Sequence, residues 1–293
     1  MTFNRRQFLA NSAATLAAAT LASPALAGLA GSANGGDPLK DLTVVNALGS
    51  LDDPNLPDAA PGVLTPRMID DARASGTSAV NCTLGYVAGP EDPFQKSIAD
   101  IGLYDAMIRN NPADLIKVLS VADIRRAKAE NRIGLIYGFQ NAVQMGDDAS
   151  RADIFANLGM RVIQLTYNVR NQLGDGSTVP DGRGLTAFGQ QVVERLNANR
   201  VMVDLSHSGR QICLDAARAS RQPISINHTG CRALVDLPRN KTDEELRLVA
   251  EKGGFIGIYF MPFLNLSGHP TAADVIAHIE HAIKVCGEDH VGI

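Results

Sequence analysis

The sequence predicts an α/β fold built as a (β/α)8 TIM-type barrel, and three observations support this prediction. Eight short apolar and β-branched runs recur along the chain. The segments between them carry apolar residues at helical spacing or helix-capping residues. The first run ends in Leu48-Gly49-Ser50-Leu51, which is not the Gly-rich phosphate loop that a doubly wound open sheet normally has there. A barrel of parallel strands is therefore favoured.

The predicted strands are distributed over the whole chain after its first forty residues. Each is short and rich in apolar or β-branched residues, as strands usually are. They are 43–48, 78–83, 133–139, 161–167, 201–206, 223–227, 255–260 and 290–293. Because the last of these lies at the end of the sequence, we expect a barrel cut after its eighth strand and incomplete at the C-terminus.

Capping residues indicate where several predicted helices begin. Thr65 stands before Pro66, which places an N-cap residue ahead of a proline at the first helical position. Thr242 begins a capping box, and Thr271 is the expected cap of the last helix. The predicted helices begin at 65, run over 121–131 and 184–199, and extend from 242 to 253 and from 271 to 287.

The first 27 residues are predicted to be a twin-arginine signal peptide. Arg5 and Arg6 precede an uncharged, Ala-rich run, and Ala25-Leu26-Ala27 follows as a cleavage site. This order predicts a periplasmic or secreted bacterial protein. Residues 28–40 are rich in Gly and are expected to be a flexible lead-in to a barrel over 41–293. No later apolar run is long enough for a membrane span.

Composition and charge exclude several classes of protein. With 45% hydrophobic and 20% charged residues, the chain is neither disordered nor fibrous. Its net charge of −4 gives no broad basic surface for nucleic acid. The four cysteines are widely spaced without a C-x-x-C motif, and their pairing stays open. We expect a small-molecule partner, with a homodimer as an open alternative.

Polar side chains stand at the ends of several predicted strands. His207 and His228 end the fifth and sixth strands, Gln140 ends the third, and Tyr167 and Asn168 end the fourth. The carboxyl ends of barrel strands meet at one face, where barrel enzymes place their chemistry. The two imidazoles are therefore expected to point to one place and to suit zinc or another first-row metal.

Arg232 follows His228 by four residues, so its guanidinium is a candidate to hold a substrate carboxylate. A surface ion pair is an equally good interpretation of this arginine. The remaining histidines, His269, His278, His281 and His290, are expected to be hydrogen-bonded or surface residues. His278 and His281 are three residues apart on a predicted outer helix, where a solvated face is expected rather than a metal site.

Several ordered motifs over the second half of the chain resemble the membrane (renal-type) dipeptidase family. They lie at 158–168, 184–189, 203–207, 238–243, 253–257 and 289–293. The resemblance extends from about residue 133 to the end. It implies a (β/α)8 barrel, a binuclear zinc site and the hydrolysis of dipeptides.

The resemblance also implies roles for individual residues. His207 and His228 match the two strand-end metal ligands of the family, and Arg232 matches the residue that binds the substrate carboxylate. Tyr167, next to Asn168, stands where many relatives have a substrate-binding histidine. Tyr167 and Asn168 are therefore expected to contact the substrate.

The chain departs from the family at its other metal ligands. Gln140 stands where the bridging glutamate is expected, and Leu48 and Ser50 stand where the H-x-D motif is expected. An amide does not supply the charge that offsets two adjacent dications, so we expect one zinc ion at most, or none. The acidic catalytic residue of the family is expected after Ile293.

Three functions stay open at this stage. The first is an exported, metal-dependent hydrolase that cleaves a dipeptide or a similar small amide with metal-activated water. The second is a non-catalytic relative that uses the barrel as a small-molecule binding or maturation factor. The third is a different hydrolase or lyase that has reused the same site.

Overall fold

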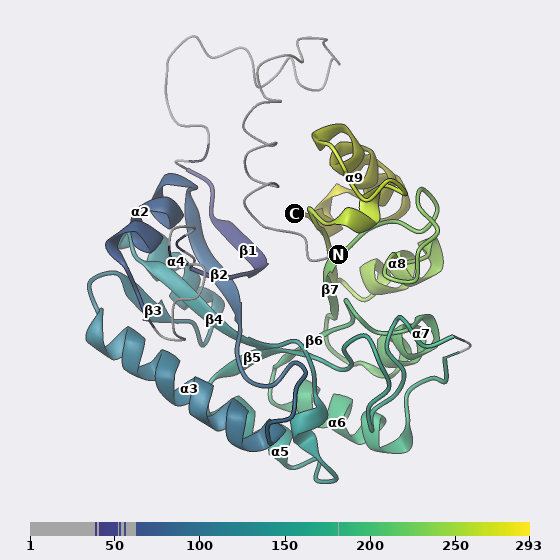
Figure 1. The fold of residues 1–293 in the computed structure, drawn as a ribbon, viewed down its shortest axis with the longest axis horizontal. Coiled ribbons are helices and arrows are strands. Elements are labelled where there is room, and N and C mark those ends of the chain that lie inside the picture. Colours follow the sequence, from purple (N-terminus) through teal and green to yellow (C-terminus); the bar gives the residue numbers. More distant parts are fainter. Residues whose placement is uncertain (1–38, 40, 52, 54–55, 57–62, 181) are drawn as a thin grey trace.

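The computed structural model describes residues 39, 41–51, 53, 56, 63–180 and 182–293. The predicted signal peptide, and all of the predicted lead-in except residue 39, lie outside these described residues. Within them the chain forms one parallel sheet surrounded by helices (Figure 1).

The sheet has nine parallel strands and curls into an open barrel (Figure 1). Eight of them follow one another in the order β1-β2-β4-β5-β6-β7-β8-β9, while β3 pairs with β4 beside this path. The strands are β1 (Val44–Gly49), β2 (Thr77–Thr83), β3 (Leu115–Lys117), β4 (Ile133–Phe139), β5 (Met160–Gln164), β6 (Met202–Asp204), β7 (Ser225–Thr229), β8 (Phe255–Ile258) and β9 (Val291–Gly292). In the described part of the chain, β1 and β9 are the two edges of the sheet.

The predicted (β/α)8 architecture is confirmed, because the eight predicted strands correspond in order to the eight strands of this path. Three of them were predicted two or more residues too long at their C-terminal ends. The fourth strand ends at Gln164, the fifth at Asp204 and the seventh at Ile258. In each case the residues beyond the strand already belong to the loop above the sheet, where the site residues lie.

Helices cover the outer face of the sheet (Figure 1). They are α2 (Pro66–Ala74), α3 (Pro93–Asn110), α4 (Val121–Ala129), α5 (Arg151–Asn157), α6 (Ala187–Ala198), α7 (Arg210–Ala219), α8 (Asp243–Glu251) and α9 (Ala272–Cys286), with short 3-10 turns η1 (Val143–Met145), η2 (Pro262–Leu264) and η3 (Glu288–His290). The predicted caps are confirmed, because the side chains of Thr65, Thr242 and Thr271 each accept a hydrogen bond from the first turn of their helix. The sequence prediction missed β3, α3, α5 and α7.

The hydrophobic core lies between the sheet and its helices. All seven residues of β4 are buried. The Phe139 ring meets the Phe155 ring of α5 edge-on, with centroids 4.9 Å apart. Burying aromatic rings in this way contributes strongly to stability, since each removes a large apolar area from water. No disulfide joins the four cysteines, all of which lie in the described part.

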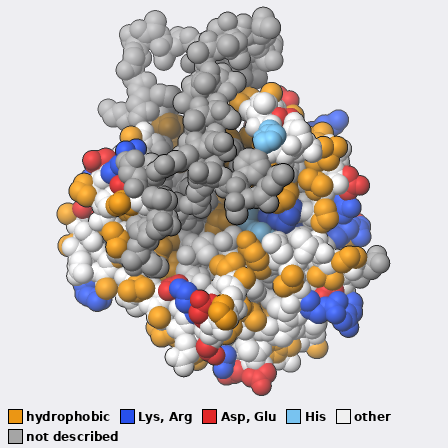
Figure 2. All heavy atoms as spheres, viewed as in Figure 1, with side chains coloured by type: hydrophobic (Ala, Val, Ile, Leu, Met, Phe, Trp, Pro, Cys, Tyr) orange, Lys and Arg blue, Asp and Glu red, His pale blue; other side chains and the backbone are white. Residues whose placement is uncertain are grey.

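The surface is mixed in charge, with Lys and Arg side chains gathered on the side of the molecule where α7 and α8 lie (Figure 2). There Arg210 and Arg218 of α7 form ion pairs with Glu244 of α8. Among the helices of the described residues, none is both long and apolar enough to cross a membrane.

Candidate active site

The structure brings the two predicted imidazoles together above the sheet. His228 lies within β7, and His207 follows the end of the neighbouring strand β6. Their ring centroids are 4.9 Å apart and their planes are inclined by 58°. Both side chains project from the C-terminal ends of parallel strands, the face at which barrel enzymes place their reacting groups.

The loop after β5 fixes the orientation of His207. The Tyr167 ring stacks on the His207 ring, with centroids 4.1 Å apart and planes 23° apart. The Nδ1–H of His207 donates to Asn168 Oδ1 across 2.7 Å. With its proton on Nδ1, this imidazole keeps a lone pair on Nε2, the arrangement that outer-sphere partners impose on metal-binding histidines.

Gln140, just after β4, contacts the second imidazole. Its Nε2 lies 3.5 Å from His228 Nε2, and its Oε1 accepts a hydrogen bond from Thr83 Oγ1 at 3.1 Å. Among the described residues, His228 Nδ1 has no hydrogen-bond partner although it is buried. Buried polar nitrogens are normally paired with protein or water, so this atom is available to a bound water or ligand.

Two buried cations lie beside the imidazoles. Arg239 is 5% exposed, and its Nη2 donates to the backbone carbonyl of His228 at 3.3 Å. Lys241 is 1% exposed and forms an ion pair with Glu245, with 3.4 Å between Nζ and Oε1. Burial, strengthened by these cations, holds the pKa values of His207 and His228 well below the ordinary histidine range. Both imidazoles are therefore neutral and able to act as ligands.

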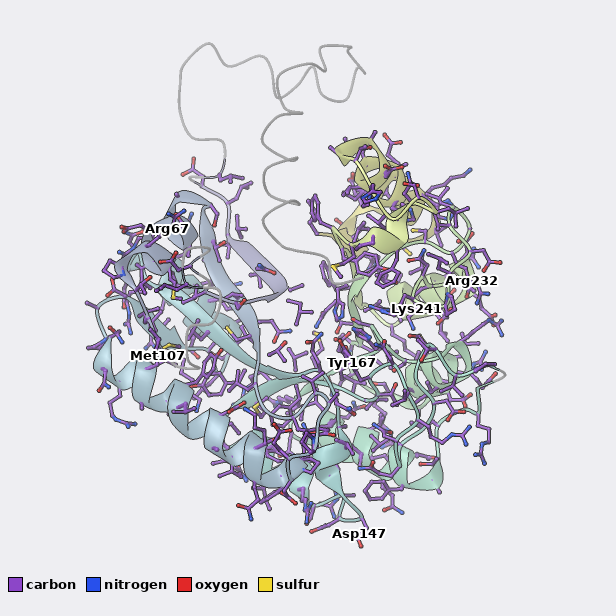
Figure 3. All side chains as sticks on the ribbon, in the orientation of Figure 1. Arg67, Met107, Asp147, Tyr167, Arg232 and Lys241 are labelled. Carbon is purple, nitrogen blue, oxygen red and sulfur yellow. The ribbon has the colours of Figure 1, made fainter. Side chains whose placement is uncertain are left out.

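The structure does not bring Arg232 to the imidazole pair. Its guanidinium pairs with Asp236 across 2.5 Å, and its side chain is 40% exposed. In Figure 3 it lies at the outer side of the molecule, away from Tyr167. The buried arginine beside the imidazoles is instead Arg239, which the sequence analysis missed as a site residue. Its place in the motif at 238–243 is the signal that could have found it.

The residues present do not fit two metal ions, and they offer an incomplete set of ligands for one. Leu48 lies in β1 and Ser50 follows it, so the strand-one positions supply neither an imidazole nor a carboxylate. Within the described residues, no three His, Cys, Asp or Glu side chains form a cluster able to hold a metal. The two neutral imidazoles supply two nitrogen donors. The Gln140 amide oxygen accepts from Thr83, and the amide would have to turn before this oxygen could complete the three ligands that catalytic zinc sites use.

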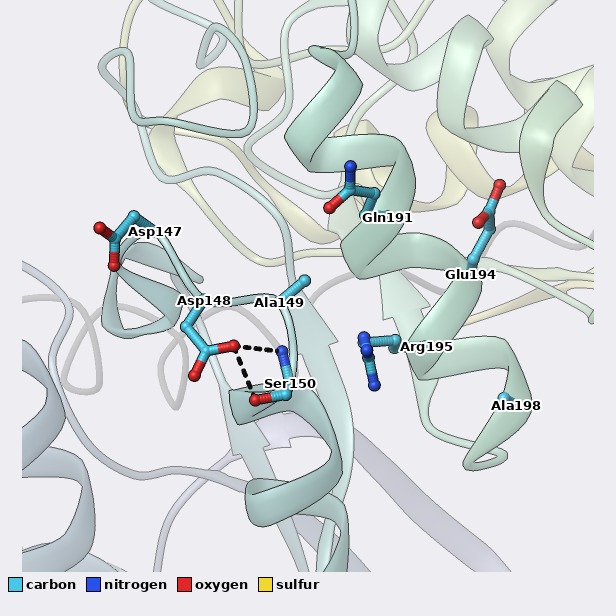
Figure 4. Close-up of a pocket in the computed structure, with 8 residues that line it drawn as sticks. All are labelled: Asp147, Asp148, Ala149, Ser150, Gln191, Glu194, Arg195 and Ala198. Carbon is cyan, nitrogen blue, oxygen red and sulfur yellow. Dashed lines mark hydrogen bonds between the residues drawn. The ribbon is translucent and has the colours of Figure 1, made fainter.

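A separate hollow lies on the outside of the molecule, between the start of α5 and the side of α6 (Figure 4). It is lined by Asp147, Asp148, Ala149, Ser150, Gln191, Glu194, Arg195 and Ala198. Asp148 accepts hydrogen bonds from the backbone and hydroxyl of Ser150, and Arg195 pairs with Asp153. Asp147 lies at the edge of the molecule in Figure 3, away from Tyr167, so this hollow is not part of the imidazole site.

Comparison with known proteins decides the family. The sequence model of the membrane dipeptidase family (peptidase family M19) matches residues 67–293. The chain belongs to the membrane dipeptidase family. This membership confirms the resemblance inferred from the sequence motifs.

Individual proteins are similar to the chain at moderate identity. The dipeptidase aclJ of Aspergillus oryzae is 30% identical over 209 residues, which cover 69% of this chain but only 49% of that protein. A crystal structure of an amidohydrolase from Pseudomonas aeruginosa is 33% identical, with a TM-score of 0.76, covering 87% of this chain and 74% of the other.

A third relative shares the fold. It is a metallopeptidase from Rhodobacter sphaeroides, solved with a phosphinate mimic of the dipeptide L-Ala-D-Ala, and it is 24% identical with a TM-score of 0.74. The alignment covers 86% of this chain and 84% of that one. This similarity confirms the barrel.

Proposed function

We propose that this protein is an exported dipeptidase-like hydrolase that cleaves a dipeptide or a similar small amide with one metal ion. The observation that carries the proposal is the pair of neutral imidazoles, 4.9 Å apart, at the C-terminal ends of neighbouring strands. Family membership supports hydrolysis of dipeptides as the class of reaction.

The residues of the site have separable roles in this proposal. His207 and His228 would hold the ion, and Gln140 would be a weaker third ligand once its amide turned its oxygen toward them. Held by these residues, a zinc ion would supply a water of lowered pKa and a Lewis acid for the substrate carbonyl. Asn168 holds His207 in the Nδ1–H tautomer, and the Tyr167 ring limits the space beside that imidazole.

The buried guanidinium of Arg239 is the best-placed cation for a substrate carboxylate. It lies beside the backbone of His228 and is shielded from water, so its interaction with an anion is stronger than that of an exposed arginine. Arg232 remains the sequence-based alternative for this role, and its pairing with Asp236 makes it the weaker candidate.

A second candidate function is the binding of a small molecule without turnover. The specific observation in its favour is the lack of carboxylates at the metal site, where Leu48, Ser50 and Gln140 stand. In that function the imidazoles, Tyr167 and Arg239 would bind a peptide-like carboxylate, and no metal would be needed.

Metal analysis and a dipeptide panel test both functions on the full-length protein. We expect about one zinc ion per chain and zinc-dependent release of amino acids, with both lost in His207→Ala and retained in His269→Ala, a change at an exposed position. A folded, metal-free protein that binds dipeptides without cleaving them would contradict hydrolysis and support the binding function.

The twin arginines support the exported location in the proposal. We expect replacement of Arg5 and Arg6 by lysine to keep the protein in the cytoplasm of a bacterial host, as measured by cell fractionation. Unchanged delivery to the periplasm would contradict twin-arginine export.

A further inference from the structure

We propose that Asp204 is a positioning residue that fixes the two imidazole-bearing strand ends relative to each other, in place of backbone hydrogen bonds between the strands. The inference rests on the proposed function only in taking His207 and His228 as the site. It assigns a task to a buried carboxylate that touches neither imidazole ring in the structure.

The backbone pairing between β6 and β7 includes fewer residues than the pairing of the strands on either side. One register pair, Asp204 with Ser225, joins these two strands, whereas three pairs join β5 to β6 and three join β7 to β8. Beyond this pair the backbone of Leu205 still donates to the Ser225 carbonyl at 2.8 Å. The strand ends that carry the two imidazoles therefore lie where the regular ladder has stopped.

Side-chain hydrogen bonds take over at that point. The Oδ1 atom of Asp204 accepts from the backbone N–H of Ser206 at 3.0 Å and from that of Asn227 at 3.1 Å. It also accepts from the Ser206 hydroxyl at 2.5 Å. The Ser206 Oγ in turn accepts from the backbone N–H of His228 at 3.1 Å. One carboxylate thus connects the residue before His207 with the residue before His228 and, through one hydroxyl, with His228 itself.

Burial makes this connection rigid. Asp204 is 2% exposed and Ser206 is fully buried. A buried carboxylate is costly unless it is hydrogen-bonded, and bonds in a water-free interior are strong. Arg239 also connects the two strand ends, because its guanidinium donates to the backbone carbonyls of both Ser206 and His228. Neither strand end is then free to shift alone.

The consequence concerns the geometry of the imidazole pair. Side chains that orient metal ligands typically change metal affinity by about 10- to 100-fold when they are replaced. Without the Asp204 oxygen, the N–H groups of Ser206 and Asn227 lose their acceptor, and the separation of the imidazoles is no longer fixed. We therefore expect a loss of site order that exceeds the loss of overall stability.

Side-chain nitrogen NMR of the histidines tests this inference without metal or substrate. The full-length protein is compared with Asp204→Asn, Asp204→Ala and Ser206→Ala. The matched control is Asp100→Asn, which alters a buried carboxylate on α3 that accepts from the Gly85 N–H at 3.0 Å. The free energy of unfolding of each variant is measured in parallel.

We expect His207 to show a single Nδ1–H tautomer in the unmodified protein. In Asp204→Ala and Ser206→Ala the signals of both His207 and His228 should shift or broaden, with a smaller effect in Asp204→Asn, whose amide oxygen can still accept. Asp100→Asn should leave both signals in place at a similar loss of stability. Unchanged imidazole signals in Ser206→Ala and Asp204→Ala would overturn the inference.

Cobalt(II) titration provides the second measurement. We expect Asp204→Ala to weaken cobalt binding by about 10- to 100-fold relative to Asp100→Asn, and equal affinities in the two variants would count against the positioning role. If the unmodified protein binds no cobalt, the proposed metal-dependent function fails, while the imidazole spectra still decide the role of Asp204.

Discussion

At the scale of single residues, strand-end position predicted the imidazole pair but not the arginine beside it. His207 and His228 follow from the rule that barrel strands end at one face. The arginine depends on how the loop after β7 folds. The Arg232 N–H donates to the Lys241 carbonyl at 2.7 Å, which closes residues 232–241 into a loop. Arg232 then points outward and Arg239 inward, and no sequence spacing predicts this closure.

The first prediction concerns Gln140. Its replacement by glutamate places a carboxylate within reach of the His228 imidazole, from which the amide nitrogen is now 3.5 Å away. A negative charge between neutral imidazole ligands favours a dication, so we expect zinc affinity to rise by roughly 10- to 100-fold. Isothermal titration measures it, with the exposed Gln190→Glu as a control for net charge. Equal zinc affinity in both variants would count against a metal site at this position.

The second prediction separates the two arginines. Cleavage or binding of a dipeptide is compared with that of the same dipeptide amide, which lacks the carboxylate. We expect Arg239→Ala to abolish a preference of about 10- to 100-fold for the free carboxylate, the size expected for a charged hydrogen bond, and Arg232→Ala to retain it. A general structural defect would lower the binding or cleavage of the dipeptide and of the dipeptide amide equally. Loss of the preference in Arg232→Ala alone would reverse the assignment.

Among the helices and strands, the sequence predicted those helices that begin with a recognisable capping residue. The helices with threonine caps were predicted, whereas α5 and α7 begin without a side-chain cap hydrogen bond. The long helix α3 has an N-cap at Asp92, but few of its residues are buried, so its apolar pattern is weak. The strand β3 has only three residues, too few for any period to show.

The solvated helix face expected for His278 is wrong, because this side chain is buried and attaches α9 to the loops beside it. The third prediction concerns this attachment. This buried imidazole accepts from the Cys231 N–H at 2.8 Å through Nδ1 and donates to the Leu264 carbonyl at 3.2 Å through Nε2. Burial lowers its pKa, and nearby His281 adds to this while Asp274 opposes it. The folded protein therefore resists protonation at His278.

The sign of the pH effect follows from this lowered pKa. Above about pH 6.5 neither the folded nor the unfolded state holds a proton on His278, and its full stability is present. As the pH falls below that value, only the unfolded state takes up the proton, so the free energy of unfolding falls by up to about 1.4 kcal/mol per pH unit. Urea unfolding at pH 7 and pH 5 should show that the free energy of unfolding falls less with pH in His278→Gln than in His269→Gln. Equal slopes in the two variants would be contrary to this expectation.

At the scale of the whole molecule, the barrel has one main core that runs from α2 to α9. A substitution that disrupts packing at one place in such a core destabilises the whole domain, because its helices and strands share packing contacts. The sequence predicted this architecture well, since eight alternating segments leave few topologies open. It did not predict how the described sheet curves, which depends on the register between neighbouring strands.

The fourth prediction tests the shared core with two phenylalanines. Phe155 is fully buried and contacts the rings of Phe139 and Phe94, whereas Phe260 is 49% exposed. We expect Phe155→Ala to lower the free energy of unfolding by about 3–5 kcal/mol. Unfolding should remain a single transition, in which the NMR signals of the two imidazoles change together with those of the core. Phe260→Ala should cost less than about 0.5 kcal/mol. Separate transitions for the core and for the site would contradict a shared core.

The register between β5 and β6 has a consequence for which changes in chain length the protein can tolerate. Gln164 lies beside Asp204 in the sheet, and Tyr167 and His207, whose rings stack, each follow these partners by three residues. Inserting or deleting one residue between Gln164 and Tyr167, or between Asp204 and His207, would separate the rings without replacing either of them. Natural variation in length is therefore expected to avoid these two short segments, so the number of residues in them is under selection as well as their identity.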